Sequence, residues 1–304
     1  MTLKQIEAFY LAATLGNFSL AAHRAHVTQS SLSKRIAELE AWVGTALFDR
    51  SGQRARLTDA GHRLLPMAAQ MLILRDGVRG VQSASAKLVG SCRFGVSELG
   101  ALTWLPSFVT QMRLENPELM LEPYVDLGRR LEKQVQRGEL DFAVVPGLPE
   151  SSSIASHIVG EVGCSWFAAP GRLSPEKHTL TPEELAEHAV IMMTEGSGLT
   201  QAFEVWAADQ GLRMRRTVAS NSLMAIIGLT MADVGLSALP DEFLSMWIEQ
   251  GKLVKFRSEP QLPRLKYFFI HRIDDRRSMI FSLLNTVVDL AQFSNAEDVS
   301  RKTP

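Results

Sequence analysis

A cluster of hydrogen-bonding side chains near position 30 has the residue types that contact the edges of nucleic-acid bases. Gln29, Ser30, Ser33 and Lys34 recur three and four residues apart, with Arg35 beside them. This spacing places them together near the start of one helix. A Gln amide can pair with adenine, Lys or Arg can reach guanine or phosphate, and a serine hydroxyl suits either partner. The pattern predicts a DNA-contacting edge, and an ordinary amphipathic helix is the alternative.

Candidate ligand-binding residues lie at two predicted strand-to-helix junctions, Ser97–Gly100 and Glu195–Gly198. A helix amino terminus presents unpaired N–H donors and a positive partial charge, so an anion is a natural occupant. The hydroxyl groups of Ser97 and Ser197 would add hydrogen bonds to such a ligand. The alternative is that both serines only cap their helices.

Glu98 does not fit a simple anion pocket, because its carboxylate follows Ser97 directly. If Glu98 faces the ligand, the ligand bears an amine or several hydroxyl groups. If Glu98 caps its own helix, it says nothing about the ligand. Asn221 and Ser222, at the start of a later predicted helix, are further candidates for the same site.

No enzyme motif is complete. The run Gly95-Val96-Ser97-Glu98-Leu99 lacks the last glycine of a G-x-S-x-G elbow, and no Walker loop or dinucleotide glycine pattern occurs. His23 and His26 lie three apart without a third nearby ligand, so no metal site is indicated. We expect neither catalysis nor a bound cofactor.

The two cysteines, Cys92 and Cys164, are far apart and form no Cys-x-x-Cys pair. They predict buried free thiols, with a redox-sensitive pair as the alternative.

The elements that position the polar edge form a predicted helix-turn-helix over residues 18–43. Ser19 is the expected N-cap of the first helix, and a turn follows at Val27-Thr28. The second helix carries its apolar stripe opposite the polar edge, at Leu32, Ile36, Leu39 and Val43. A packing helix precedes the motif and ends at Gly16. After it, the loop of residues 51–58 carries arginines around Gly52 and predicts a wing against the phosphates.

A second long helix is predicted from Thr58, its N-cap, to Leu88. Apolar residues recur along it three and four apart, as in a coiled-coil seam: Leu64, Met67, Met71, Leu74, Val78, Val81 and Leu88, with Ser85 at one seam position. The seam favours a linker helix that pairs with a second copy. A core helix is the alternative.

Beyond residue 88, predicted strands alternate with helices, which is typical of a parallel α/β fold. The first lobe has strands at 92–97, 119–125 and 141–146, with helices at 99–114 and 129–137. The second has strands at 163–169, 190–194, 215–219 and 236–239, with helices at 199–210 and 222–231. A last strand is predicted at 265–271 and a last helix at 278–292.

The chain resembles the LysR-type transcriptional regulators over nearly its whole length. Residues 3–50, the wing and LTDAGHRLLP at 57–66 resemble that family's winged helix-turn-helix. GELDFAVVPG at 138–147 and VGLSALP at 234–240 resemble its periplasmic-binding-protein-like effector domain. The resemblance implies DNA contacts by the recognition helix and wing, and a small organic effector between two lobes. It implies a homodimer, with dimers pairing into a tetramer.

The resemblance assigns roles by position. The DNA-contacting residues would be Gln29, Ser30, Ser33, Lys34, Arg35, Arg54 and Arg56, and the effector-binding residues Ser97, Glu98, Gly128, Ser197 and Asn221. Relatives often carry a hydroxyl residue where this chain has Gly128.

The implied fold class is α/β, with an all-α winged helix-turn-helix, a linker helix and a two-lobed α/β domain. The implied parts are a DNA-binding domain at 1–58, a linker at 59–89, an effector domain at 90–293 and a tail at 294–304. Lobe I would comprise 90–162 and 267–293, and lobe II 163–266.

Composition and charge agree with a regulator of this kind. The 304 residues are 46% hydrophobic, enough for two or three packed units, and the net charge is −1. Residues 1–63 carry eight Lys and Arg against five Asp and Glu, so this end is locally basic. We expect no signal peptide, no membrane partner and a cytoplasmic location. A small-molecule binding or transport module without a transcriptional role is the alternative function.

Overall fold

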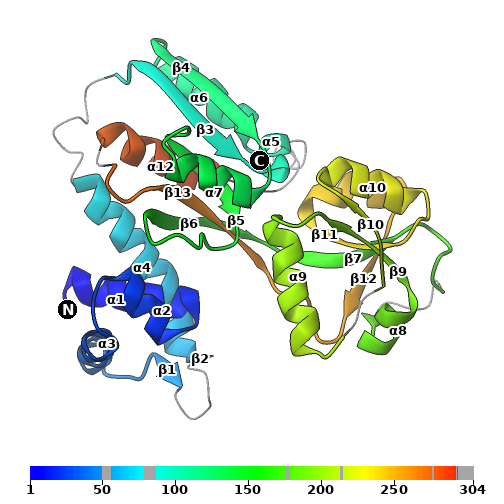
Figure 1. Ribbon diagram of the computed structural model, residues 1–304, viewed down its shortest axis with the longest axis horizontal. Coiled ribbons are helices and arrows are strands. Elements are labelled where there is room, and N and C mark those ends of the chain that lie inside the picture. Colours follow the sequence, from blue (N-terminus) through cyan, green and yellow to red (C-terminus); the bar gives the residue numbers. More distant parts are fainter. Residues whose placement is uncertain are drawn as a thin grey trace, which may run out of the picture.

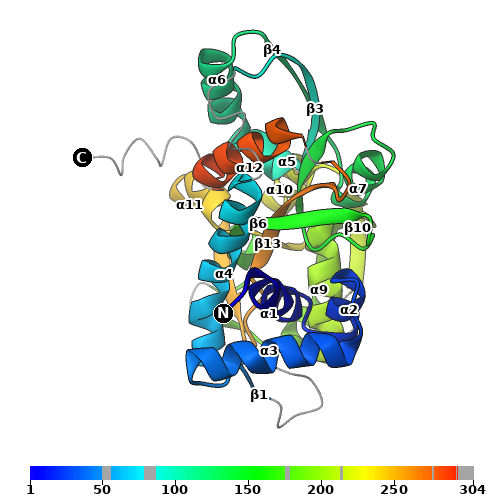
Figure 2. The same cartoon turned by 90° about the vertical axis from the view of Figure 1, so that its left-hand side faces the viewer.

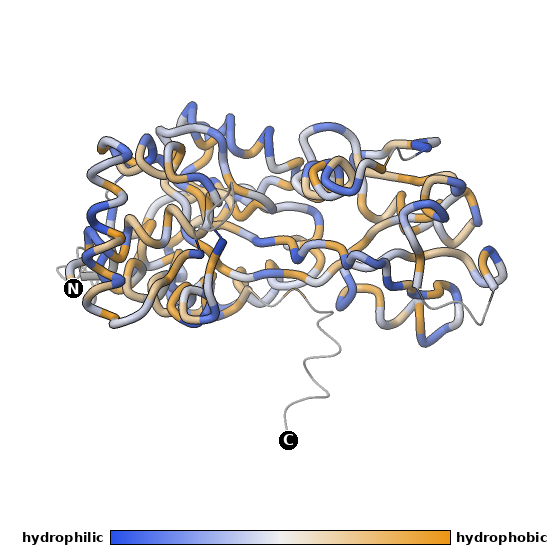
Figure 3. Tube along the Cα trace, turned by 90° about the horizontal axis from the view of Figure 1, so that it is seen from below, coloured by the Kyte–Doolittle hydropathy of each residue, from blue (hydrophilic) through white to orange (hydrophobic). Residues whose placement is uncertain are grey.

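The computed structural model describes residues 1–49, 56–78, 87–174, 179–212, 215–275, 277–291 and 293. In the described part, no helix is both long and apolar enough to cross a membrane. The chain forms a helical amino-terminal unit and two α/β lobes, with lobe II at one end of the molecule (Figures 1 and 3). The predicted α/β fold class, with a helix-turn-helix ahead of two sheets, is confirmed.

The amino-terminal unit is a helix-turn-helix followed by a short hairpin and a long helix. Its elements are α1 (Leu3–Leu15), α2 (Phe18–Arg24), α3 (Gln29–Val43), β1 (Phe48–Asp49), β2 (Arg56–Leu57) and α4 (Asp59–Val78). Gly16 ends α1 in the left-handed conformation that glycine adopts without strain, as predicted. Thr58 accepts a hydrogen bond from the Gly61 amide and caps α4, also as predicted.

The N-cap predicted for α2 is wrong by two residues. Asn17, in extended conformation, accepts a hydrogen bond from the Leu20 amide and begins the helix. Ser19 therefore lies inside the first turn, and its hydroxyl donates to Gln29 Oε1 at 2.8 Å. Asn and Ser are nearly equivalent caps, so the sequence did not separate them.

Lobe I is a five-stranded sheet of order β4-β3-β5-β13-β6 with helices on both faces (Figure 1). Its elements are β3 (Gly90–Val96), α5 (Glu98–Leu102), α6 (Leu105–Glu115), β4 (Leu119–Val125), α7 (Gly128–Gln136), β5 (Phe142–Pro146), β6 (Ile154–Val162), β13 (Leu265–Arg272) and α12 (Ser278–Leu290). Phe94, Phe142 and Phe269 stack across three neighbouring strands, with ring centroids 5.0 and 4.4 Å apart. The single helix predicted at 99–114 is two helices, and Pro106 lies in the first turn of the second.

Lobe II is a six-stranded sheet of order β10-β9-β11-β7-β12-β8. Its elements are β7 (Cys164–Ala168), β8 (Thr179–Leu180), α8 (Pro182–Glu187), β9 (Ala189–Met193), α9 (Gly198–Asp209), β10 (Arg215–Ser220), α10 (Leu223–Met231), β11 (Leu236–Pro240), the 3-10 turn Glu242–Leu244, α11 (Ser245–Glu249) and β12 (Val254–Ser258). The chain enters lobe II at Gly163 and returns between Ser258 and Leu265. One hydrophobic core runs through both lobes.

The amino-terminal unit docks on lobe I through Arg24, the last residue of α2. Its guanidinium donates to the carbonyl oxygens of Pro149 at 2.7 Å and Ile154 at 3.1 Å, and to that of Ser151. The first and third of these carbonyls belong to the loop before β6, and that of Ile154 to the first residue of β6. The helix-turn-helix is thereby joined to the effector half of the same chain.

A second docking contact lies on the edge strand of the lobe I sheet, where α1 faces β6 (Figure 2). The Ile158 amide donates to the Tyr10 hydroxyl at 3.1 Å, so a side chain satisfies an edge N–H group. Burial raises the pKa of Tyr10 to about 12, which keeps this hydroxyl neutral. Nearby, Arg75 of α4 pairs with Glu7 of α1 at 3.0 Å.

Candidate functional site

The polar edge of α3 is exposed and held in place by its apolar side. Gln29, Ser30 and Lys34 are exposed at the start of the helix, and Ser33 and Arg35 are half-buried. On the other side Leu32, Ile36 and Leu39 are fully buried in the amino-terminal core, but Val43, predicted for the same stripe, is exposed at the end of the helix. Thr28 caps the helix by accepting from the Ser31 amide at 3.2 Å. The five predicted DNA-contacting residues of α3 thus occupy its first two turns.

Of the wing predicted at residues 51–58, the structure describes 56–58, which include β2 and its pairing with β1. The two strands pair antiparallel, with Phe48 opposite Leu57 and Asp49 opposite Arg56. Phe48 is buried against Phe9 and Phe18, which anchors the hairpin to the helices. Arg56 is exposed on β2, whereas Arg54 lies outside the described residues.

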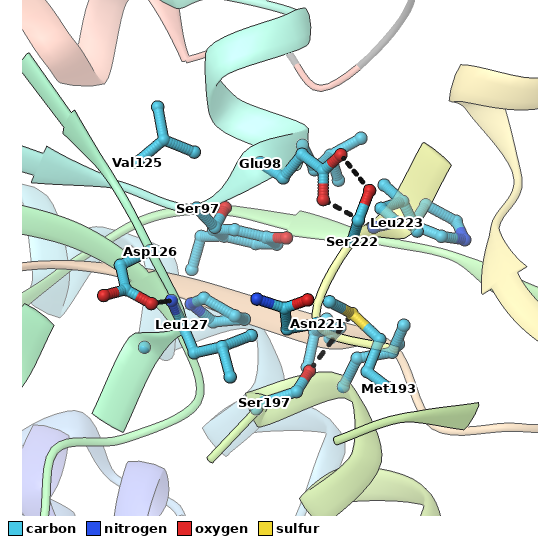
Figure 4. Close-up of a pocket in the computed structure, with 18 residues that line it drawn as sticks. Ser97, Glu98, Val125, Asp126, Leu127, Met193, Ser197, Asn221, Ser222 and Leu223 are labelled. Carbon is cyan, nitrogen blue, oxygen red and sulfur yellow. Dashed lines mark hydrogen bonds between the residues drawn. The ribbon is translucent and has the colours of Figure 1, made fainter. Parts of the chain in front are cut away.

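A cavity of about 230 Å³ lies between the two lobes (Figure 4). The five residues predicted for the effector site, Ser97, Glu98, Gly128, Ser197 and Asn221, all line it. Ser222, which the sequence named beside Asn221, lines it too. The sequence did not single out Asp126, Met193 and Tyr267, which also belong to the wall. Tyr267 lies in the middle of β13, and the alternation of Leu265, Tyr267 and Phe269 was the one signal that it shares a face with buried residues.

The cavity wall is built where strands end and helices begin. In lobe I, β3 leads through Ser97 into α5 and β4 leads through Leu127 into α7; in lobe II, β9 and β10 lead in the same way into α9 and α10. Within each lobe the two strands belong to a sheet with parallel neighbours, so their carboxyl ends meet at one edge. This is the edge at which open α/β folds bind ligands.

The two predicted serines differ in their local contacts. Ser97 Oγ accepts from the Gly100 amide at 3.4 Å, so it caps α5 while lining the cavity. Tyr267 is fully buried, which raises the pKa of its hydroxyl, and a hydrogen bond with Ser97 acts against this rise. Ser197 makes no cap bond with its side chain; its hydroxyl donates to Met193 Sδ at 3.4 Å. Since sulfur is a weak acceptor, Ser197 keeps most of its hydrogen-bonding capacity.

Glu98 lines the cavity, so the first of the two roles considered from the sequence holds in part. Its carboxylate neither caps its own helix nor stands free in the cavity, because it accepts hydrogen bonds from lobe II. The donors are Ser222 and the first amides of α10 (Figure 4). The partner segment is 124 residues away in the chain, so no local pattern could have identified it.

The two cysteines lie in different lobes, and burial disfavours ionisation of their thiols. Both are free thiols: Cys92 in β3 of lobe I is buried, as predicted, whereas Cys164 in β7 of lobe II is only half-buried. Burial, and next the charges of nearby aspartates, raise the pKa of each thiol to about 12. Within the described ranges, no group of three or more His, Cys, Asp or Glu side chains could hold a metal ion.

Two protein families match this chain, one over the amino-terminal unit and one over the two lobes. Residues 3–62 match the family described as bacterial regulatory helix-turn-helix protein, lysR family, and residues 85–291 match the LysR substrate binding domain. The HTH-type transcriptional regulator YusT of Bacillus subtilis is 27% identical over 287 residues, which cover 93% of each chain. YwqM of the same organism, also named an HTH-type transcriptional regulator, is 25% identical over 268 residues, 86% of this chain and 90% of its own.

A solved structure of similar fold is CrgA, a LysR-type transcriptional regulator from Neisseria meningitidis. It superposes with a TM-score of 0.68 at 18% sequence identity, over 96% of this chain and 100% of CrgA. At this identity the likeness concerns the fold.

Proposed function

The chain belongs to the LysR family of transcriptional regulators, which are DNA-binding proteins and not enzymes, and we propose which of its residues contact DNA and effector. Two family matches in the expected order, one of them over more than half of the chain, support this premise. The observation that carries the proposal is the cavity between the lobes together with the exposed polar edge of α3.

We assign DNA contact to α3 and the hairpin. Gln29, Ser30 and Ser33 read base edges in the major groove, where the first turns of a recognition helix lie. Lys34 and Arg35 reach guanine or phosphate. Arg56 contacts the phosphate backbone, as does Arg54, which lies outside the described residues.

We assign effector binding to the cavity between the lobes. Ser97, Gly128, Ser197 and Asn221 offer hydroxyl, amide and backbone groups from both lobes around a volume that suits a small organic molecule. Glu98 is the fifth residue of this site. A ligand held by both lobes stabilises their closed arrangement relative to an open one.

The assembly we propose is a homodimer through α4, with two dimers forming a tetramer on DNA. Met67 and Leu74, seven residues apart on α4, are 56% and 68% exposed in the single chain. Apolar side chains at this spacing suit burial against a second copy of the helix. A dimer would place two recognition helices about one DNA turn, or a multiple of it, apart. The protein would act in the cytoplasm, where its DNA lies.

A series of contacts connects the cleft, the space between the lobes that holds the cavity, with the amino-terminal unit. It begins at the start of α7. The Arg129 amide of lobe I donates to the Gly196 carbonyl of lobe II at 3.2 Å. The guanidinium of the same residue pairs with Glu150 in the loop before β6. A change in lobe closure would therefore act on this loop.

The loop then acts on the helix-turn-helix. Glu132 of α7 accepts from the Ser151 amide at 2.9 Å, and the carbonyl of Ser151 accepts from Arg24. The effector can regulate transcription only if it binds the free and DNA-bound arrangements with different affinity. We propose that this chain of contacts supplies the difference.

Selection of genomic fragments by the purified full-length protein, at a stated salt concentration, tests the proposal. We expect enrichment of an interrupted palindrome whose half-sites are one helical turn or a multiple apart. Lys34→Ala should weaken retention, whereas Lys252→Ala, which removes an exposed lysine of lobe II, should not. No enriched sequence at any salt, or equal loss with both variants, would contradict the assignment.

A further inference from the structure

The Glu98 carboxylate joins the two lobes across the cleft. Its Oε2 accepts from the Leu223 amide at 2.5 Å, and its Oε1 accepts from Ser222 Oγ at 3.0 Å and from the Met224 amide at 3.3 Å. All three donors belong to the N-cap and first turn of α10, a nine-residue helix of lobe II. Figure 4 shows the carboxylate pointing from lobe I toward these groups.

This geometry is that of an anion bound at a helix amino terminus. The first amides of a helix lack internal partners and carry a positive partial charge, so they bind carboxylate and phosphate groups of ligands. Hydrogen bonds to an ionised acceptor are about twice as strong as neutral ones. In this chain the carboxylate comes from the protein, so Glu98 fills a place that a ligand carboxylate could otherwise take.

The charges of the cavity wall also disfavour an anionic ligand. Of the 18 residues that line it, Glu98 and Asp126 are acidic, and none is Lys, Arg or His. Asp126 accepts from the Leu127 amide at 2.7 Å, and the cation that pairs with it among the described residues, the exposed Arg130, is 3.4 Å away. An anionic ligand would meet two carboxylates and no cationic side chain on this wall.

The lobes also meet at the other end of the cleft. There the Arg129 amide donates to the Gly196 carbonyl, and Gly198 packs so closely on the Pro146 carbonyl that an added Cβ would lie 2.2 Å from its oxygen. Closure at the α7–α9 end thus rests on backbone contacts. At the α5–α10 end, by contrast, the hydrogen bonds across the cleft among the described residues converge on one side chain, Glu98.

We propose that Glu98 is an internal ligand of the cleft, and that the effector is therefore a non-anionic small molecule with hydroxyl or amine donors. The carboxylate holds α10 against α5 in the manner of a bound acid, and it presents its remaining acceptor capacity to the cavity together with Asp126. This inference rests on the proposed role of the cavity as the effector site. Glu98 sets the specificity of that site by excluding carboxylates from α10.

The test is chemical rescue of the full-length protein. Glu98→Ala removes a CH₂–COO⁻ group that acetate matches, so acetate should bind the vacated amides of α10. We expect sodium acetate to raise the melting temperature of Glu98→Ala saturably, by about 2–4 °C over equal sodium chloride at pH 7. The wild type should show no difference between the two salts, because its site is occupied.

Two further variants locate the effect. Glu98→Gln keeps a side chain of the same size on α10 and should not respond to acetate. Adding Ser222→Ala to Glu98→Ala removes one donor and should weaken the response to acetate several-fold. If Glu98→Ala folds only in acetate, that result supports the proposal equally.

Three outcomes would overturn the proposal: no specific acetate effect on Glu98→Ala, an equal effect on the wild type, or a variant that stays unfolded in acetate. None of these outcomes involves DNA. The assignment of the DNA-binding residues and of the operator would therefore stand or fall separately, by the fragment selection.

Discussion

Replacing Arg24 with alanine should loosen the helix-turn-helix from lobe I. The guanidinium of Arg24 makes three hydrogen bonds to carbonyl oxygens of the loop before β6 and of the first residue of β6. At about 0.5–1.5 kcal/mol each, these bonds contribute about 1.5–4.5 kcal/mol to docking. Water can reach the half-buried carbonyls after truncation, so we expect a loss of about 1.5–3 kcal/mol, the lower part of that range.

Hydrogen exchange of the Ile158 amide measures this loss of docking free energy. This amide donates to the Tyr10 hydroxyl from the edge strand β6, so its protection from solvent depends on docking of α1. A loss of about 1.5–3 kcal/mol corresponds to hydrogen exchange about 10- to 150-fold faster, at about 1.4 kcal/mol per factor of ten. Hydrogen exchange of the segment 149–160, resolved by NMR or mass spectrometry, measures it.

Matched variants separate docking from a general loss of stability. Arg113→Ala removes an exposed arginine of α6 and should leave exchange at Ile158 unchanged. Tyr10→Phe removes the acceptor of the Ile158 amide itself, so exchange of that amide should rise at least as much as in Arg24→Ala, whereas the other amides of 149–160 should change less. Unchanged exchange in Arg24→Ala, or equal acceleration across the lobe II sheet, would refute the reasoning.

Three further predictions concern the DNA edge, the dimer and the thiols. Gln29→Ala should cost about 1–3 kcal/mol at one base pair of the operator, whereas Arg56→Ala should weaken binding to all sequences and lower the salt slope by about one, both measured by DNA titration. Leu74→Glu should raise the dimer dissociation constant about 100-fold or more, measured by sedimentation, because each copy loses buried apolar area. Cys92 and Cys164 should stay protonated and unreactive toward a disulfide reagent at pH 8, because burial raises the pKa of both to about 12.

Each of these three predictions can be checked against a control, and each could be contradicted by a specific result. Leu114→Glu places the same charge at an exposed position of α6 and should leave the dimer intact; dissociation in both variants would count against the α4 interface. Gln29→Ala would fail its prediction if all operator positions lost affinity alike. Both thiols should react once the protein is unfolded in denaturant, and rapid reaction of the native protein would contradict their burial.

The raised pKa values of the thiols also predict how the stability of the protein changes with pH. In the unfolded chain a thiol ionises near pH 8.5, whereas in the folded chain the pKa is about 12. The unfolded state therefore loses protons first as pH rises, and stability should fall between about pH 9 and 12. Substituting both cysteines with alanine should make the melting temperature depend less on pH between about pH 9 and 12.

Local chemistry explains which structural features were predictable. Gly16 and Thr58 mark helix boundaries through their own backbone or hydroxyl groups, so the sequence predicted them correctly. The stripe on α3 is likewise a pattern within one helix. The break after α5 was missed although Pro106, which suits the first turn of a new helix, was a signal for it.

Non-local packing explains what was missed. Strand β6 was not predicted, because its burial pattern is irregular: it pairs with β13 across a register shift and is covered on its other edge by Tyr10. The partner of Glu98 lies in another lobe, and the place of Tyr267 on the cavity wall depends on how the two sheets meet. Such relations arise only when distant segments fold together.

The central claim is that the cleft and the DNA-binding edge are thermodynamically coupled. The direct test is the dissociation constant of the effector, identified from genes beside the selected operator, for free protein and for operator-bound protein under the same salt. The account predicts that the two constants differ, by about 5- to 150-fold, the range usual for coupled sites. Equal constants would contradict it, because a ligand that binds both states alike cannot shift the equilibrium between them.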